Sequence, residues 1–421
     1  MLLAALEADM KNTFLCAAVV ILSCAFVPAQ QYQVLYNFPS GYEPLGGLVF
    51  DSAGNLYGTT SGGGVGGCYA GSTCGTVFEL SPSASGAWTL SAIYEFCAND
   101  PSCPDGNFPL GGLAIDSLGN LYGTTQYGGK STCYLDGCGV AFELSPPSAP
   151  GGAWTYTNLH TFCTAADCAD GAFPRWGTLT LDRLGNLYGT TEAGGSGTGH
   201  GQNGDNGVVF ELSPGVGGWS ETVLYNFCSY GQQGLCSDGN APQSGVTFDQ
   251  SGNLYGTTMW GGLYSKKNSE EGNGLIFKLS PGSNGWTETV VYAFPASGTY
   301  GSNPTAPVSF DLSGNLYTTF SGYYGEGIAG VGRISRGGQR NEILLSAITP
   351  SGVLIDDKRN VLYGYNFNTV YEIDKSGHIT FLPYGGFEAY GNFVEDDSGN
   401  LYGVSSQGGA YGGGVVYEIT P

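Results

Sequence analysis

The chain has 421 residues, of which 73 are Gly and 20 are Pro, so the composition argues against a helical protein. Hydrophobic residues make up 41% and charged residues only 11%, which argues against disorder, and the glycines lack the every-third-residue period of collagen. A formal charge of −22, with only 13 Lys and Arg, leaves no basic footprint for nucleic acid or anionic lipid. These numbers indicate a large all-β globular protein.

The first predicted element is an export signal. Met10 and the lysine after it precede an apolar run over residues 14–27, which ends in Pro-Ala. This pattern is typical of a secretory signal peptide, so we expect the mature chain to lack residues 1–29, with translation starting at Met10 and cleavage before Gln30. A lipoprotein anchored at Cys24 is disfavoured because apolar residues continue past that cysteine. We expect the mature chain to be secreted, periplasmic or at the cell surface, without a transmembrane helix.

One motif, Asp-x-x-Gly-Asn-Leu-Tyr-Gly, then recurs along the rest of the chain. The motif has seven copies, and the aspartates that begin them are Asp51, Asp116, Asp182, Asp249, Asp311, Asp357 and Asp396. Each copy divides into four short segments rich in branched and aromatic residues, which in the first copy are 46–51, 55–60, 75–80 and 88–96. Four antiparallel strands per repeat are typical of a propeller blade, so residues 30–421 are predicted to form one domain, a seven-bladed β-propeller.

The ends of the chain predict how the ring closes. The last copy has a third segment over 414–419 but no fourth, whereas residues 32–38 carry the pattern of a fourth segment before the first copy. We therefore expect the N-terminal strand to complete the last blade, which removes an open sheet edge.

Ten cysteines remain after the signal, and they fall as close neighbours. The pairs are Cys68/Cys74, Cys97/Cys103, Cys133/Cys138, Cys163/Cys168 and Cys228/Cys236. In an exported chain this arrangement predicts five disulfides that each close one loop. Zinc is the competing interpretation, but the sequence has no C-x-x-C, and its three histidines lie far from the paired cysteines in the sequence.

The repeated D-x-x-G-N-L-Y-G-T-T, the Gly-Gly after it, G-x-V-F-E-L-S-P and W-T-x-x-x-L-Y-x-F together resemble the GloVer tandem-repeat family of exported bacterial proteins. The first two segments are also similar to the hairpins of NHL-type propellers. The resemblance covers the mature chain and is specific in the first four copies; Thr318 replaces the final glycine in the fifth, and the sixth is degenerate. It implies an exported or surface β-propeller and no particular reaction.

The repeated aspartates could form a calcium or catalytic ring, but a turn role is favoured. In Asp-x-x-Gly-Asn the carboxylate can accept backbone N–H bonds while the glycine adopts a left-handed conformation, for which Asn360 is the tolerated substitute in the sixth copy. A second series, the third-segment glutamates such as Glu79, is replaced by Lys278 and Arg333, which favours a solvated position. No nucleophile, metalloprotease or phosphate-loop motif is present in the sequence, so we predict no cofactor, with calcium left open.

The long loops and their aromatic residues should gather at one end of the ring, together with the cysteines. Loops on a rigid scaffold commonly carry binding residues, and packing between neighbouring loops is the alternative role for these aromatics. The candidate contacts are Trp176, Trp260, Tyr323, Tyr324, Tyr127 and Tyr264. We expect a monomeric module that binds an extracellular glycan, polymer or protein; an extracytoplasmic lyase or hydrolase with carboxylates at the channel mouth is the alternative.

Overall fold

The structure is a computed structural model. It describes residues 30–65, 67–68, 73–129, 137–149, 151–196, 206–229, 236–262, 272–295, 302–304, 306–320, 329–336, 340–343, 352–366, 368–374, 376–385 and 388–420. The predicted signal peptide lies outside these residues. Within them, no helix combines the length and the apolar character that a membrane crossing requires.

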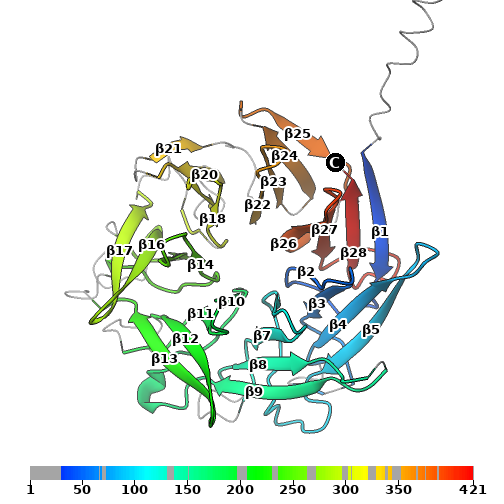
Figure 1. Ribbon diagram of the computed structural model, residues 1–421, viewed down its shortest axis with the longest axis horizontal. Coiled ribbons are helices and arrows are strands. Elements are labelled where there is room, and N and C mark those ends of the chain that lie inside the picture. The colour runs from blue at the N-terminus through cyan, green and yellow to red at the C-terminus, as the bar shows by residue number, and fades with distance from the viewer. Residues whose placement is uncertain are drawn as a thin grey trace, which may run out of the picture.

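Seven four-stranded antiparallel sheets stand around a central axis and form a seven-bladed β-propeller, as the repeats predict (Figure 1). We number the blades in the order of their turn aspartates. From the innermost strand outward, the blades are: blade 1, β2 (Val49–Phe50), β3 (Leu56–Thr60), β4 (Thr76–Pro82) and β5 (Trp88–Glu95); blade 2, β6 (Ala114–Ile115), β7 (Leu121–Thr125), β8 (Val140–Ser145) and β9 (Thr155–Thr161); blade 3, β10 (Thr180–Leu181), β11 (Leu187–Thr191), β12 (Val208–Gly215) and β13 (Gly218–Asn226); blade 4, β14 (Thr247–Phe248), β15 (Leu254–Thr258), β16 (Leu275–Gly282) and β17 (Gly285–Ala293); blade 5, β18 (Ser309–Phe310), β19 (Leu316–Phe320), β20 (Gly330–Ile334) and β21 (Arg340–Ile343); blade 6, β22 (Gly352–Asp356), β23 (Val361–Asn366), β24 (Thr369–Asp374) and β25 (Ile379–Leu382); blade 7, β26 (Ala389–Glu395), β27 (Leu401–Ser405), β28 (Val415–Thr420) and β1 (Gln31–Asn37). A 3-10 turn, η2 (Ala166–Cys168), lies in the loop between blades 2 and 3.

The ring closes through β1, as the sequence predicts. This strand is antiparallel to β28, with Gln31 opposite Thr420 and Asn37 opposite Val415 (Figure 1). Leu35 and Phe38 are buried at this junction. The first described strand therefore fills the outermost place of the last blade.

The glycine of each Leu-Tyr-Gly motif makes room for an aromatic ring on the next strand. A Cβ atom on Gly58 would lie 2.6 Å from the ring of Phe78, and a Cβ on Gly189 would lie 2.6 Å from Phe210. In blade 5 the pair is exchanged: Thr318 stands in the glycine position opposite Gly332, and Phe320 supplies the buried ring. The departure from the repeat therefore preserves the packed volume.

The innermost strands of blades 1 to 5 are shorter than the sequence predicts. In blade 1 only Val49–Phe50 form ladder pairs, although the pattern predicts a strand over 46–51. Gly46 and Gly47 instead approach the backbones of neighbouring blades, where a Cβ would lie 2.4 Å from the carbonyl oxygen of Gly111 and 2.9 Å from the amide nitrogen of Asn392. These glycines line the centre of the ring and do not extend the sheet.

The repeated aspartates hold the turns between the two inner strands. Asp51 accepts backbone hydrogen bonds from Ala53 and Asn55 through Oδ1, and side-chain bonds from Asn55 and Tyr57 through Oδ2. Gly54 has a φ of +85°, which favours glycine. Corresponding backbone and asparagine bonds recur at Asp116, Asp182, Asp249, Asp311 and Asp396. These carboxylates are occupied by their own turns.

The sixth turn requires a correction, because Asp356 and not Asp357 holds it. Asp356 Oδ1 accepts the backbone N–H groups of Lys358 and Arg359, and Asn360 has the left-handed φ of +64°. The loss of the glycine shifts the pairing so that Asp356 ends β22 opposite Val361. Asp357 then points to the neighbouring blade and accepts the Leu312 N–H at 3.2 Å.

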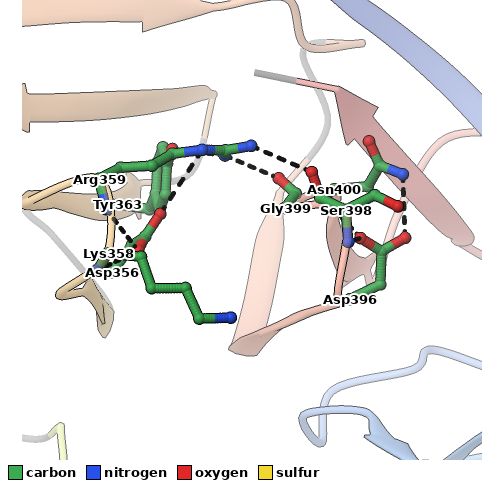
Figure 2. A network of polar contacts seen from close by, with 8 residues as sticks. All are labelled: Asp356, Lys358, Arg359, Tyr363, Asp396, Ser398, Gly399 and Asn400. Atoms are coloured by element: carbon green, nitrogen blue, oxygen red, sulfur yellow. Dashed lines mark hydrogen bonds and ion pairs between the residues drawn. The ribbon is translucent and has the colours of Figure 1, made fainter.

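Arg359 in this altered turn joins blade 6 to blade 7. Its Nη1 donates to the carbonyl of Gly399 at 2.9 Å, and its Nη2 donates to the carbonyl of Ser398 at 3.2 Å (Figure 2). Nη1 also donates to the hydroxyl of Tyr363, and Nε lies 3.7 Å from Asp356 Oδ2. One side chain thus links two adjacent turns near the closure of the ring.

Candidate functional site

The disulfides lie at the end of the ring that carries the long loops, which we call the loop face. Four of the five predicted pairs are formed, and each closes a connection between strands. They are Cys68–Cys74, Cys97–Cys103, Cys163–Cys168 and Cys228–Cys236. Cys133 lies outside the described residues, so its pairing with Cys138 stays a prediction.

Two of these disulfides pack against each other in blade 1. The Cys68 Sγ lies 3.8 Å from both Cys97 Sγ and Cys103 Sγ. Of the His, Cys, Asp and Glu side chains that the structure describes, these four cysteines are the one group close enough together to hold a metal ion. Because their sulfurs are bonded in pairs, the structure favours disulfides over zinc at this place.

A strained backbone position recurs on the loop face, and the sequence pattern did not reveal it. The residue before the proline that leads into each of blades 1 to 5 has a φ between +51° and +57°, and these residues are Glu43, Phe108, Phe173, Ala241 and Asn303. Phe108 donates its N–H to Cys74 of blade 1 and accepts the Gln126 N–H of blade 2. The position therefore ties the loops of neighbouring blades together and fixes the rim of the face.

A cavity of about 260 Å³ lies at the centre of the ring, toward the loop face, and residues from all seven blades line it. Trp176 is 38% exposed and contributes the one tryptophan of the lining. Gln243, Tyr365, Tyr390 and Asn392 add polar and aromatic groups, and Gly, Leu, Ala, Pro and Thr complete the wall. Among the residues that the structure describes, no Asp, Glu, His, Lys or Arg lines the cavity.

Charged residues beside this cavity brace its wall. Arg175 Nη1 donates to Glu192 Oε1 at 2.9 Å, and Gln243 Nε2 donates to the same oxygen at 2.7 Å. Gln126, in the amide orientation that satisfies its bonds, accepts from Arg175 Nε at 2.6 Å. Arg175 precedes Trp176 directly, so this network holds the backbone that carries the exposed indole.

The other predicted contact residues are distributed differently. Trp260 is half-buried on the loop face, where its backbone pairs with Asn240, and it does not line the central cavity. Tyr127 packs edge-on against Phe108 and Phe173, with ring centroids 5.9 and 5.8 Å apart. This matches the alternative in which loop aromatics pack between neighbours. Tyr264, Tyr323 and Tyr324 lie outside the described residues.

The third-segment glutamates are half-buried and do not converge. Glu79, on β4 opposite Tyr57, accepts from Ser81 Oγ at 2.8 Å, and the same contact recurs at Glu143 and Glu211. Burial raises the pKa of Glu372 and Glu418. This series follows the blades around the ring, which fits a structural position better than a catalytic one.

A second acidic series was missed by the sequence reasoning. Asp105, Asp170 and Asp238 each lie two residues after a disulfide cysteine, in a repeated C-x-D-G that could have revealed them. Asp105 Oδ2 accepts from the Tyr94 hydroxyl at 2.8 Å, and Asp238 Oδ2 accepts from Tyr225 at 2.9 Å. Each carboxylate thus fastens a loop to the outermost strand of its blade.

In blade 2 a histidine replaces the tyrosine in this contact. His160 Nε2 lies 3.4 Å from Asp170 Oδ2, which also accepts the N–H and the hydroxyl of Thr164. Burial would raise the pKa of Asp170, but these bonds lower it to about 2. Burial raises the pKa of Glu221, on the outermost strand of blade 3, to about 7, although His160 lowers it and Asp170 adds to the rise. These groups lie between outer strands, away from the central cavity.

Comparison with known proteins finds a family model that matches the repeat and solved structures that share the fold. Residues 23–266 match the model of the Gloeobacter/Verrucomicrobia repeat. No protein of curated function matches the sequence.

Solved structures with the same fold are distant in sequence. A polysaccharide lyase, the PL25 ulvan lyase bound to -[GlcA(1-4)Rha3S]-, is 10% identical with a TM-score of 0.55, over 92% of this chain and 95% of that one. PorZ, a surface component of the type IX secretion system of Porphyromonas gingivalis, is 14% identical with a TM-score of 0.53, over 92% and 48%. The AfRom2 CNH domain is 9% identical with a TM-score of 0.52, over 93% and 99%. At these identities the likeness concerns the fold alone.

Proposed function

The chain belongs to the Gloeobacter/Verrucomicrobia repeat family, and we propose that it is an exported binding module which takes a neutral or cationic saccharide in the central cavity of its loop face. The observation that carries the proposal is the exposed Trp176 in a cavity to which every blade contributes. An indole plane can stack on a sugar ring while losing little side-chain entropy, and amides and tyrosine hydroxyls can bind sugar hydroxyls.

The chemistry of the lining supports binding over catalysis. A lyase or hydrolase needs an acid and a base within reach of the scissile bond, and most glycosidases use two carboxyl groups. In the described part of the chain, the lining offers tyrosine hydroxyls and amides but no carboxylate or imidazole. The charged pair beside the cavity, Arg175 with Glu192, is engaged in holding the wall.

The experiment is a binding screen of the purified mature protein against cellohexaose, xylohexaose, mannohexaose and chitosan hexamer. Titration calorimetry then compares the wild type with Trp176→Ala. Phe381→Ala is the matched control, because Phe381 is 59% exposed on the outer strand β25 and does not line the cavity. We expect Trp176→Ala to weaken binding by about tenfold or more and the control to leave it unchanged.

Two outcomes would contradict the proposal. Equal affinity of the wild type and Trp176→Ala would show that the saccharide does not bind in the central cavity. Release of new reducing or unsaturated ends from any of the four oligosaccharides would support the lyase or hydrolase alternative.

A further inference from the structure

A tryptophan on one blade covers a tyrosine on the preceding blade at four consecutive junctions of the ring. The pairs, with their centroid distances, are Trp88–Tyr402 (6.3 Å), Trp154–Tyr57 (5.8 Å), Trp219–Tyr122 (6.1 Å) and Trp286–Tyr188 (6.5 Å). Each tryptophan stands at the start of an outermost strand, and each tyrosine comes from a Leu-Tyr motif. This contact closes the groove between adjacent blades.

The junction between blades 4 and 5 lacks the covering ring. Residues 330–350, which include the outermost strand of blade 5, contain no tryptophan. Tyr255 is only partly buried, whereas the tyrosines at the six equivalent positions are all buried. These include Tyr317 and Tyr363, whose junctions also lack a tryptophan, so the exposure is particular to the junction between blades 4 and 5. The edge of Phe310 still packs on Tyr255, with centroids 5.0 Å apart, so an aromatic corner remains.

A cavity of about 510 Å³ occupies this junction, at the end of the ring opposite the loop face. Phe248, Tyr255 and Phe310 form its aromatic part. The turns of blades 4 and 5 supply the polar groups of Gln250, Ser251 and Ser313. The volume lies within the range of about 300–1,000 Å³ that is typical of small-molecule sites.

Two cations line the same cavity in a strongly acidic protein. Lys278 and Arg336 are two of only 13 basic residues in the chain. Lys278 Nζ lies 5.9 Å from the centroid of the Tyr255 ring, and no ion pair joins either cation to a carboxylate among the residues that the structure describes. The equivalent position on β4 carries Glu79 opposite Tyr57, whereas β16 carries Lys278 opposite Tyr255. Blade 4 therefore has a positive charge in place of a negative one beside the cavity.

Asp249 and Asp311 are the carboxylates among the described lining residues, and neither forms an ion pair with Lys278 or Arg336. Asp249 accepts the N–H groups of Ser251 and Asn253 and the side-chain amide of Asn253, and Asp311 makes the equivalent bonds to Asn315. Their remaining lone pairs can accept hydroxyl groups of a ligand.

We propose that the groove between blades 4 and 5 is a binding site for an acidic saccharide. The sugar ring lies on the aromatic corner of Tyr255 and Phe310, its carboxylate faces Lys278 and Arg336, and its hydroxyls donate to the turn carboxylates. This site lies apart from the central cavity and would bind a ligand of different charge. The two proposals can therefore be tested independently of each other.

Titration calorimetry with digalacturonate tests the proposal, and the dimethyl ester of the same sugar removes the charge while keeping the ring. The variant Lys278→Glu introduces the residue that blades 1 to 3 carry at this position, so the fold should tolerate it. Arg183→Glu is the matched control, since it makes the same change of net charge on an exposed turn that does not line the cavity.

We expect wild type to bind digalacturonate, with a loss of about tenfold or more on esterification or in Lys278→Glu, because either change removes a charge-assisted hydrogen bond. Arg183→Glu should leave the affinity unchanged. Lys278→Gln supplies a second, neutral variant, and circular dichroism checks the fold of both. Failure of wild type to bind the acid, equal binding of acid and ester, or equal loss in the Arg183 control would each overturn the proposal.

Discussion

Removal of the closing strand should cost the ring much of its stability. A chain that begins at Pro39 lacks β1, which pairs with β28 on both sides of an irregularity at Leu35. It also lacks Phe38, which follows the strand, and it thereby loses two buried side chains, Leu35 at 9% and Phe38 at 1% exposure. Burial of one large apolar side chain contributes about 1.5–3 kcal/mol, so these two residues contribute about 3–6 kcal/mol together. That is a large part of the free energy of unfolding of a typical folded domain, which is about 5–15 kcal/mol.

The loss has a second consequence, because β28 would become an unpaired edge at the end of blade 7. Exposed edges pair with other chains, so the truncated protein should form dimers or aggregates. Thermal unfolding followed by circular dichroism, together with light scattering after size exclusion, compares it with a chain that begins at Gln30. A synthetic peptide of residues 30–38 should restore the monomer by adding the missing strand.

Point variants separate this effect from truncation itself. Phe38→Ala should lose about 3–5 kcal/mol, because its ring packs against Phe78 at a centroid distance of 5.2 Å. Gln33→Ala, at an exposed position on β1, should stay within about 0.5 kcal/mol of the wild type. A truncated chain that remains monomeric with an unchanged melting temperature would refute the reasoning.

Three further predictions concern the loops, the sixth turn and a buried acid. Peptide mapping without reduction should find Cys133 bonded to Cys138, and a crosslink from either to another loop would contradict local pairing. Arg359→Ala should lower stability by about 1–2 kcal/mol in denaturant titration, since two backbone carbonyls of blade 7 lose their donor, whereas Arg183→Ala should have no measurable effect. Glu221 has its pKa raised by burial to about 7 from an ordinary value of 4.5, so its ionisation destabilises the folded state progressively as pH rises between these values. Glu221→Gln should therefore melt higher than the wild type near pH 8 and at about the same temperature near pH 4, and a constant difference across that range would show that ionisation of Glu221 is not the cause.

Local chemistry made most of the fold predictable. The turn needs only an aspartate, a glycine that accepts a positive φ and an asparagine, all within five residues, and the bonds around Asp51 are formed as the motif predicts. The pairing of Cys97 with Cys103 is likewise local. Ring closure was predictable because seven copies of one unit leave a single strand unmatched at each end.

The degenerate copy shows where local reasoning fails. With Asn360 in place of glycine, either Asp356 or Asp357 could hold the turn. The register of β22 against β23 decided in favour of Asp356, and that register depends on the packing of the whole blade. Asp357 became available to the neighbouring turn as a result.

The sequence by itself determined the four strands of each blade apart from the length of the innermost ones, the number of blades, the closing strand and four local disulfides. Each of these depends on residues near one another in the chain or on close repetition. Tertiary structure alone decided that Trp176 reaches the central cavity while Trp260 does not, because seven distant segments must converge to form that cavity. It also decided that Tyr255 is only partly buried while Tyr317 is buried, although neither faces a tryptophan of the next blade. Burial and cavities arise from contacts between adjacent blades. The sequence of one repeat therefore does not specify which of its side chains the next blade will cover.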